Sequence, residues 1–206
     1  EALAGHCDEI TVMINKDGSI TTVDNGRGIP TGMHPKFKVP ALQVVMTKLH
    51  AGGKFDKDTY KVSGGLHGVG ISVVNALSKK LSVEVYREDK KFSQDYSRGK
   101  PLNDMKTEEG IAGKTGTTVT FWPDDDIFET TEYSFDVLAA RLRELAFLNK
   151  GIKISIMDKR DGKEKQQSLQ YPEGIKSFVG FLNENKTQLH EVIYFEKEKQ
   201  GLHLEI

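Results

Sequence analysis

The stretch Ser63-Gly64-Gly65-Leu66-His67-Gly68-Val69-Gly70 carries four glycines and leads into an apolar pattern of helical spacing at Ile71, Val74 and Leu77. Glycine is costly inside a regular element, because it loses the most backbone freedom on folding. A glycine-rich loop that runs into a helix start lets the backbone approach an anion closely, and the helix dipole favours negative charge there. The stretch therefore indicates a phosphate-binding loop, with a flexible turn as the alternative. Its spacing matches neither a P-loop nor a dinucleotide fingerprint.

The composition is that of an ordinary globular chain. It has 206 residues, 37% hydrophobic and 29% charged, with a formal net charge of −1. This charge excludes a strongly basic nucleic-acid module as the whole function. The single cysteine, Cys7, excludes an intramolecular disulfide and favours a reducing, cytoplasmic location, with a buried structural role for the thiol. No apolar run approaches the roughly 20 residues of a membrane span. The chain starts without Met, at residues typical of a helix end, and we expect a fragment whose first helix is missing.

Two β-rich runs at residues 10–14 and 19–23 flank Asp17-Gly18, which predicts a hairpin. The second run ends in Asp24-Asn25-Gly26-Arg27-Gly28-Ile29-Pro30, where two glycines and a proline stop a strand. Asp24 is therefore predicted at a strand end, where a rigid element can present a functional side chain to a loop.

A short amphipathic helix is predicted after Pro40, which suits the first helical position, with Leu42, Val45, Met46 and Leu49 on its buried face. The next segment, residues 51–63, has no periodicity. A loop of that length between helices is typically functional or disordered, and this one is a candidate lid. The alternative is a solvated surface loop.

Further strands are predicted at residues 81–86, 92–96, 117–122, 153–156, 166–170, 192–195 and 202–206. Helices are predicted at 135–146 and 175–182, a long polar excursion at 99–116, and a turn and helix-capping region at the acidic run 124–126. Hairpin-linked strands without regular β-α-β alternation predict an α+β fold, a two-layer α/β sandwich. Its sheet is mixed and mostly antiparallel, with helices on one face.

Three blocks in order resemble a known family: residues 24–30, His50-Ala51-Gly52-Gly53-Lys54-Phe55, and residues 60–70. With Thr115-Gly116-Thr117 and Phe121-Trp122-Pro123, they closely resemble the ATPase subunits of bacterial type II DNA topoisomerases, the gyrase B type and its topoisomerase IV counterpart. These belong to the GHKL ATPases, whose Bergerat fold the resemblance implies. It also implies a GHKL domain at residues 1–172, lacking its first helix and N-terminal arm, and the start of a transducer (ribosomal protein S5-like) domain at residues 173–206.

The resemblance implies an ATP site. Asp24 would accept the adenine amino group's hydrogen bond beside Thr117, Gly28 would leave room for the base plane, and Ile29, Pro30 and Val45 would wall it. Arg27 would stack over the pocket and pair with Glu1, while Arg27 and Arg87 would meet coumarin-type inhibitors at its mouth. Phosphates and the lid would use a further set: Gly65, Leu66, His67, Gly68, Val69 and Gly70 for the phosphates, and Lys54 and Tyr60 from the lid.

The family's general-base glutamate and its Mg²⁺-holding asparagine map upstream of Glu1, and its γ-phosphate lysine maps downstream of residue 206. No catalytic or metal residue is therefore expected in this chain. In the parent, with ATP and Mg²⁺ as cofactors, the resemblance implies ATP-dependent dimerisation and clamp closure for DNA strand passage and negative supercoiling. The partners would be the gyrase A subunit and double-stranded DNA, with no membrane.

Three alternatives stay open. One is the topoisomerase IV ATPase subunit. Another is a different GHKL ATPase, such as a mismatch-repair protein, a heat-shock chaperone or a sensor histidine kinase, which would lack the 51–55 block and Phe121-Trp122-Pro123. The third is a nucleotide-binding or structural fragment that does not hydrolyse ATP.

Overall fold

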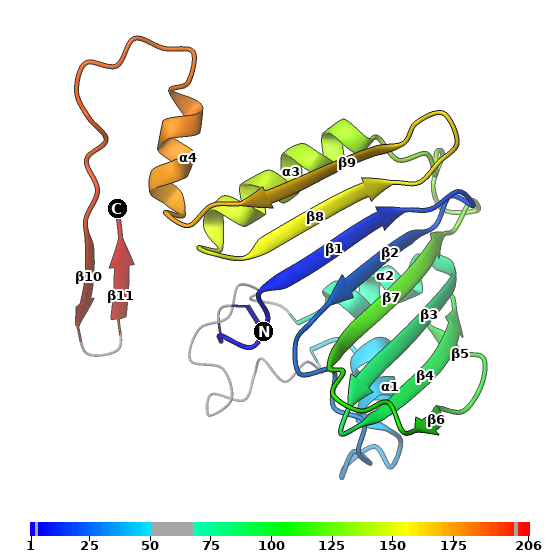
Figure 1. Ribbon diagram of the computed structural model, residues 1–206. Helices are drawn as coiled ribbons and strands as arrows, with labels where there is room; N and C mark the ends of the chain where they lie inside the picture. The colour runs from blue at the N-terminus through cyan, green and yellow to red at the C-terminus, as the bar shows by residue number, and fades with distance from the viewer. Residues whose placement is uncertain (3, 51–67, 200–201) are drawn as a thin grey trace.

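The computed structural model describes residues 1–2, 4–50, 68–199 and 202–206 (Figure 1). Within this part a nine-stranded sheet runs in the order β5-β4-β3-β7-β2-β1-β8-β9, and β6 pairs with β4. Its strands are β1 Glu9–Ile14, β2 Ile20–Asp24, β3 Ser78–Arg87, β4 Lys90–Ser97, β5 Lys100–Pro101, β6 Lys106–Glu109, β7 Gly116–Pro123, β8 Lys153–Asp158 and β9 Lys165–Gln170. The remaining elements are α1 Ala41–Thr47, α2 Gly70–Ala76, α3 Phe135–Leu148, α4 Ile175–Leu182 and the hairpin β10 Glu196–Lys199 with β11 Leu202–Glu205.

The large sheet is mixed, as predicted. Strand β1 pairs antiparallel with β2 and parallel with β8, while the other pairs in the sheet are antiparallel. A parallel pair needs a crossover, because a tight turn reverses the chain direction. Here α3 supplies it: β7 runs parallel to β1 through β2, and the chain crosses by α3 to β8.

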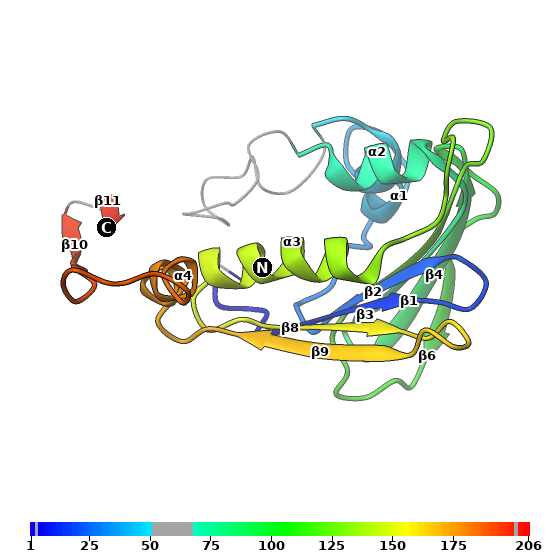
Figure 2. The ribbon, with the colours of Figure 1, turned by 90° about the horizontal axis from the view of Figure 1, so that it is seen from above.

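Figure 2 shows α1, α2 and α3 on one face of the large sheet, which confirms the predicted two-layer sandwich. The core lies between these layers. Strand β3 buries Leu81, Val83 and Val85 completely, against Leu42 and Met46 of α1. The residues between them point to the opposite face of the sheet, so β3 has an apolar face toward the helices and a more polar face away from them. A second cluster packs α3 on β1, β2 and β8: Val12, Ile14, Ile20, Ala139 and Ile156.

Helix α1 is shorter than predicted. It ends at Thr47, because Lys48 is extended with φ −114° and ψ 136°. Leu49 therefore leaves the helix and is 62% exposed, and the buried residues are Leu42, Val44 and Met46. Pro40 is the N-cap rather than the first helical residue. The predicted lid at residues 51–63 lies outside the described residues.

Two short strands, β5 and β6, occupy the segment predicted to be a polar excursion. Their residues are exposed, so they carry no apolar alternation, and only the backbone pairing with β4 makes them strands. Strand β10 lies at Glu196–Lys199 instead of residues 192–195. Its residues are charged and exposed, so no buried face marks its position in the sequence. The acidic run forms a turn but caps no helix, because Ser134 caps α3 by accepting from the Val137 N–H.

Cys7 is buried, as predicted. In the part of the chain that the structure describes, no helix combines the length and apolar character that membrane crossing requires.

Candidate nucleotide-binding site

Asp24 stands at the last position of β2, directly opposite Thr117 of β7. Its Oδ1 accepts hydrogen bonds from the backbone N–H of Gly26 at 2.9 Å and of Thr117 at 3.3 Å. Among the described residues no group donates to Oδ2, which leaves this oxygen for a ligand. Burial raises the pKa of the Asp24 carboxyl, the nearby Glu1 carboxylate adds to this, and the two N–H groups oppose it. The side chain is thus held in place by one oxygen and offers the other as an acceptor.

Glycines let the turn after β2 approach β7 closely. Gly116 has φ +131°, and a Cβ there would come within 2.1 Å of the Asp24 carbonyl oxygen. At Gly26 a Cβ would lie 3.0 Å from Asp24 Oδ1. The sequence places Gly116 in a family motif but does not reveal this packing role. The close contact joins β2 and β7, which are far apart in the chain, so it leaves no local sequence pattern.

Gly28 also has a positive φ, +78°, but its Cβ would point at β3, 2.9 Å from the Tyr86 carbonyl oxygen and from Val85 Cγ1. The structural reason for this glycine is therefore its packing against β3. The expected role of Gly28, to leave room for the base plane, stays a prediction beside this packing.

Arg27 and Glu1 form a two-point ion pair, as the resemblance led us to expect. The Arg27 Nε lies 3.0 Å from Glu1 Oε2, and its Nη2 lies 3.1 Å from Oε1. The Arg27 backbone N–H also donates to Oε2, at 3.4 Å. This pair holds the Arg27 side chain beside the turn that follows Asp24.

Arg87, at the end of β3, contacts the same turn. Its Nη1 donates to the Gly28 carbonyl at 3.2 Å, and its Nε pairs with Glu88 at 2.9 Å. Of the two arginines that the resemblance placed at an inhibitor pocket, Arg27 therefore belongs to the 26–28 turn and Arg87 contacts it.

The predicted base-pocket walls are spread over two elements. Ile29 packs against the cluster of α1 and β3, Val45 is half-buried on α1, and Pro30 is exposed. Thr117 is only 7% exposed. The predicted walls of the base pocket are thus partly in the core and partly at the surface.

The glycine-rich stretch ends at Gly70, which is the first residue of α2. Gly68 has φ +59°, Val69 is the N-cap, and a Cβ on Gly70 would meet nothing within 4 Å. The remaining predicted phosphate and lid residues lie outside the described part of the chain: Lys54, Tyr60, Gly65, Leu66 and His67.

No group of three or more His, Cys, Asp or Glu side chains in the described residues is arranged to hold a metal ion.

Comparison with known proteins identifies this arrangement. Residues 1–127 match the family described as histidine kinase-, DNA gyrase B- and HSP90-like ATPase. The chain belongs to this ATPase family. The match spans the strand-end aspartate, both arginines and the glycine stretch, and it confirms the family resemblance read from the sequence.

Individual members of the ATPase family are similar over the full chain. It is 57% identical to the DNA gyrase B subunit of Halalkalibacterium halodurans over 208 residues, covering 100% of this chain and 32% of that protein. It is 51% identical to the DNA topoisomerase 4 B subunit of Staphylococcus aureus over 207 residues, 100% of this chain and 31% of that one. The chain thus spans about a third of the length of these relatives.

A solved structure agrees in fold. The 43K ATPase domain of Thermus thermophilus gyrase B, in complex with an aminocoumarin, superposes with a TM-score of 0.84 at 38% identity. The match covers 100% of this chain and 52% of that one. The chain is therefore homologous to a gyrase B ATPase domain, and the predicted fold type is confirmed.

Proposed function

We propose that these 206 residues bind ATP as part of the B subunit of a bacterial type II DNA topoisomerase of the gyrase kind. The observation that carries the proposal is Asp24, a half-buried carboxylate at a strand end with one oxygen anchored and the other open to a hydrogen-bond donor. The adenine amino group is such a donor. The family match supports reading it this way.

The proposed roles follow the two halves of the site. Asp24 and Thr117 bind the base, Ile29, Pro30 and Val45 form the walls of its pocket, and Gly28 leaves room for the base plane. Arg27, held by Glu1, covers the pocket mouth. Gly65 through Gly70 hold the phosphates by backbone N–H groups, and Lys54 and Tyr60 reach the nucleotide from the lid. Residues 1–172 form the ATPase domain, and residues 173–206 begin the transducer domain.

ATP supplies a triphosphate whose cleavage resets the clamp in the full-length protein. These 206 residues alone bind it without appreciable hydrolysis, because the resemblance puts the general base that activates the attacking water upstream of Glu1. The Mg²⁺ ligand is likewise proposed to lie upstream. In the cytoplasm the full-length protein works with a gyrase A subunit and double-stranded DNA, and its ATPase domains dimerise when ATP binds.

Calorimetric titration with a non-hydrolysable ATP analogue tests the proposal. We expect saturable binding at a single site and no binding of a guanine analogue, because the O6 of guanine cannot donate to Asp24. A folded chain that binds neither would contradict the proposal and favour a structural fragment.

The topoisomerase IV ATPase subunit is the second candidate, and the 51% identity to the Staphylococcus aureus protein supports it. The two kinds of subunit share the same ATP chemistry. Negative supercoiling by the full-length protein reconstituted with a gyrase A subunit distinguishes them, because topoisomerase IV passes strands without introducing negative supercoils.

A further inference from the structure

A buried amide links the two helices that carry the two halves of the site. Asn75 of α2 is fully buried, and its Nδ2 donates to the Met46 carbonyl of α1 at 2.9 Å. Its Oδ1 is also buried, and in the described part of the chain it is the one buried side-chain polar atom without a hydrogen-bond partner. Burying an unpaired acceptor costs its desolvation. Stability therefore does not account for an amide at this position, and its contact with α1 is the feature to explain.

The bond from Asn75 also completes the end of α1. The last four carbonyls of a helix have no partner inside the helix, and the Met46 carbonyl belongs to this set in a helix that ends at Thr47. Asn75 supplies the missing donor from a residue 29 positions away. This side chain therefore sets where α1 ends relative to α2.

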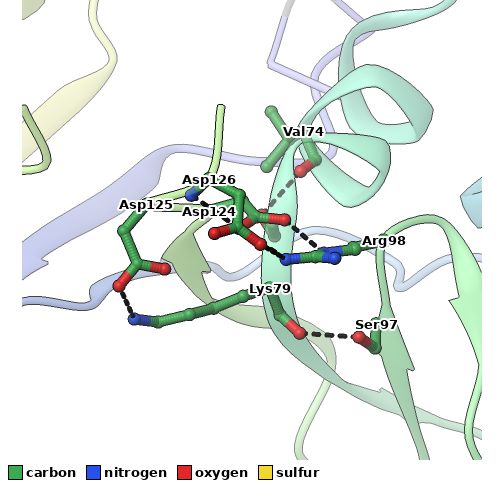
Figure 3. Close-up of polar contacts among 8 residues, drawn as sticks. Val74, Lys79, Ser97, Arg98, Asp124, Asp125 and Asp126 are labelled. Carbon is green, nitrogen blue, oxygen red and sulfur yellow. Dashed lines mark hydrogen bonds and ion pairs between the residues drawn. The ribbon is translucent and has the colours of Figure 1, made fainter. Parts of the chain in front are cut away.

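Helix α2 is itself anchored at its C-terminal end, next to the ion pair of Arg98 with Asp124 that Figure 3 shows. The backbone N–H groups of Gly99 and Asp124 donate to the carbonyls of Asn75 and Leu77, at 3.1 Å each. Arg98 binds the fully buried Asp124 carboxylate and, beyond it, Asp126. The residues that directly follow β4 and β7 thus hold the C-terminal end of α2, which fixes the position from which Asn75 bonds α1.

The linked elements are those of the proposed nucleotide site. Val45, a proposed wall of the base pocket, precedes Met46 in α1, and α2 begins at Gly70, the last residue of the proposed phosphate loop. We propose that Asn75 is a positioning residue that keeps the base pocket and the phosphate loop at the spacing of one bound nucleotide. This inference rests on the proposed function of the site.

The test uses the full-length protein with Asn75→Leu, which keeps the approximate volume and removes both the donor and the unpaired acceptor. Asn75→Ala is the second variant, since it makes no steric demand. The control is Ser78→Ala. Ser78 is also buried and follows the same helix closely, at the first position of β3, but its hydroxyl donates to the Val74 carbonyl at 2.6 Å.

Equilibrium dialysis would measure two ligands, a non-hydrolysable ATP analogue and adenosine. We expect the Asn75 variants to bind the ATP analogue about tenfold more weakly, and adenosine within twofold of the wild type, because adenosine does not use the phosphate half. The control should match the wild type for both ligands.

Equal weakening of both ligands would overturn the inference, because it would indicate a general loss of structure. Unchanged binding of the ATP analogue would overturn it too. Failure of the wild-type protein to bind the ATP analogue would instead refute the proposed function, and this inference with it.

Discussion

At the scale of single residues, the site depends on one carboxylate whose two oxygens have different tasks. Oδ1 of Asp24 closes the turn through Gly26 and Thr117, and Oδ2 is available to a ligand. An asparagine retains the first acceptor and replaces the second with a donor. The two tasks can therefore be separated by a substitution that changes very little in shape.

We expect Asp24→Asn to bind ATP about 10- to 100-fold more weakly, since a hydrogen bond to a charged group contributes roughly 1.5–3 kcal/mol. Its melting temperature should not fall. The folded pKa of Asp24 is raised, so its contribution to stability is full at low pH and is lost as pH rises through that pKa. At neutral pH the buried charge is a cost that Asn removes.

Calorimetry and thermal melts at pH 7 would check this, with Asp95→Asn as the control. Asp95 is also a half-buried strand carboxylate, but it bonds Ser82 and Asn103, away from the proposed site. A loss of ATP affinity shared by the control would argue against a specific role for Asp24.

The approach of Gly116 to β2 gives a second prediction at this scale. Gly116→Ala should destabilise the fold by about 2 kcal/mol or more, because its Cβ would overlap the Asp24 carbonyl in a backbone conformation that alanine rarely adopts. Gly113→Ala is the matched control. It also has a positive φ, +72°, but open space around it. Urea unfolding measures the free energy of unfolding of both variants. Equal losses of stability in the two would show that the close approach of Gly116 to Asp24 has no effect.

At the scale of elements, the anchor of α2 depends on an ion pair that was not predicted. The sequence predicts a turn and helix-capping region at residues 124–126, and nothing local indicates that Arg98, directly after β4, reaches it. Arg98 has φ +47°, a conformation uncommon for a residue with a side chain. The contact exists because β3 brings the ends of β4 and β7 together (Figure 3).

This anchor predicts a pH dependence. Hydrogen bonding from Arg98 lowers the pKa of Asp124, so the pair contributes stability above the unfolded pKa and loses it as pH falls through the folded pKa. Arg98→Gln should therefore melt lower than the wild type at pH 7, and the gap should narrow below about pH 4. Arg141→Gln, which removes an exposed pair with Glu144 on α3, is the control and should shift little at either pH.

At the scale of the whole molecule, the proposed boundary after residue 172 can be tested by truncation. Phe147 of α3 is almost fully buried and stacks on Tyr171 and on Phe178 of α4, with ring centroids 3.7 and 4.8 Å apart. Removing residues 173–206 takes away the second ring and leaves the large sheet complete.

We expect residues 1–172 to melt lower than the longer chain, because Phe147 becomes exposed, and to bind the ATP analogue within about threefold of it. Phe178→Ala in the 206-residue chain serves as the control for the lost ring contact. If the truncated chain did not fold, the boundary would lie elsewhere.

The fold class could be predicted from the sequence because its signals are local. Alternation in β3 and helical spacing in α3 depend on neighbours a few residues apart, and the hairpin of β1 and β2 depends on Asp17-Gly18. Asp24 could be placed at a strand end for the same reason. Strands without a buried face, such as β6 and β10, gave no such signal and were missed or misplaced.

Contacts between distant segments were decided only by the tertiary structure. Asp24 meets Thr117 across 93 positions, Asn75 meets Met46 across 29, and Arg98 meets Asp124 across 26. Residue type alone does not indicate such pairs, because any buried amide or exposed arginine would look the same in the sequence. Strand order decides which side chains meet. The composition and periodicity of the chain determined which elements form, and the packing of those elements determined the site.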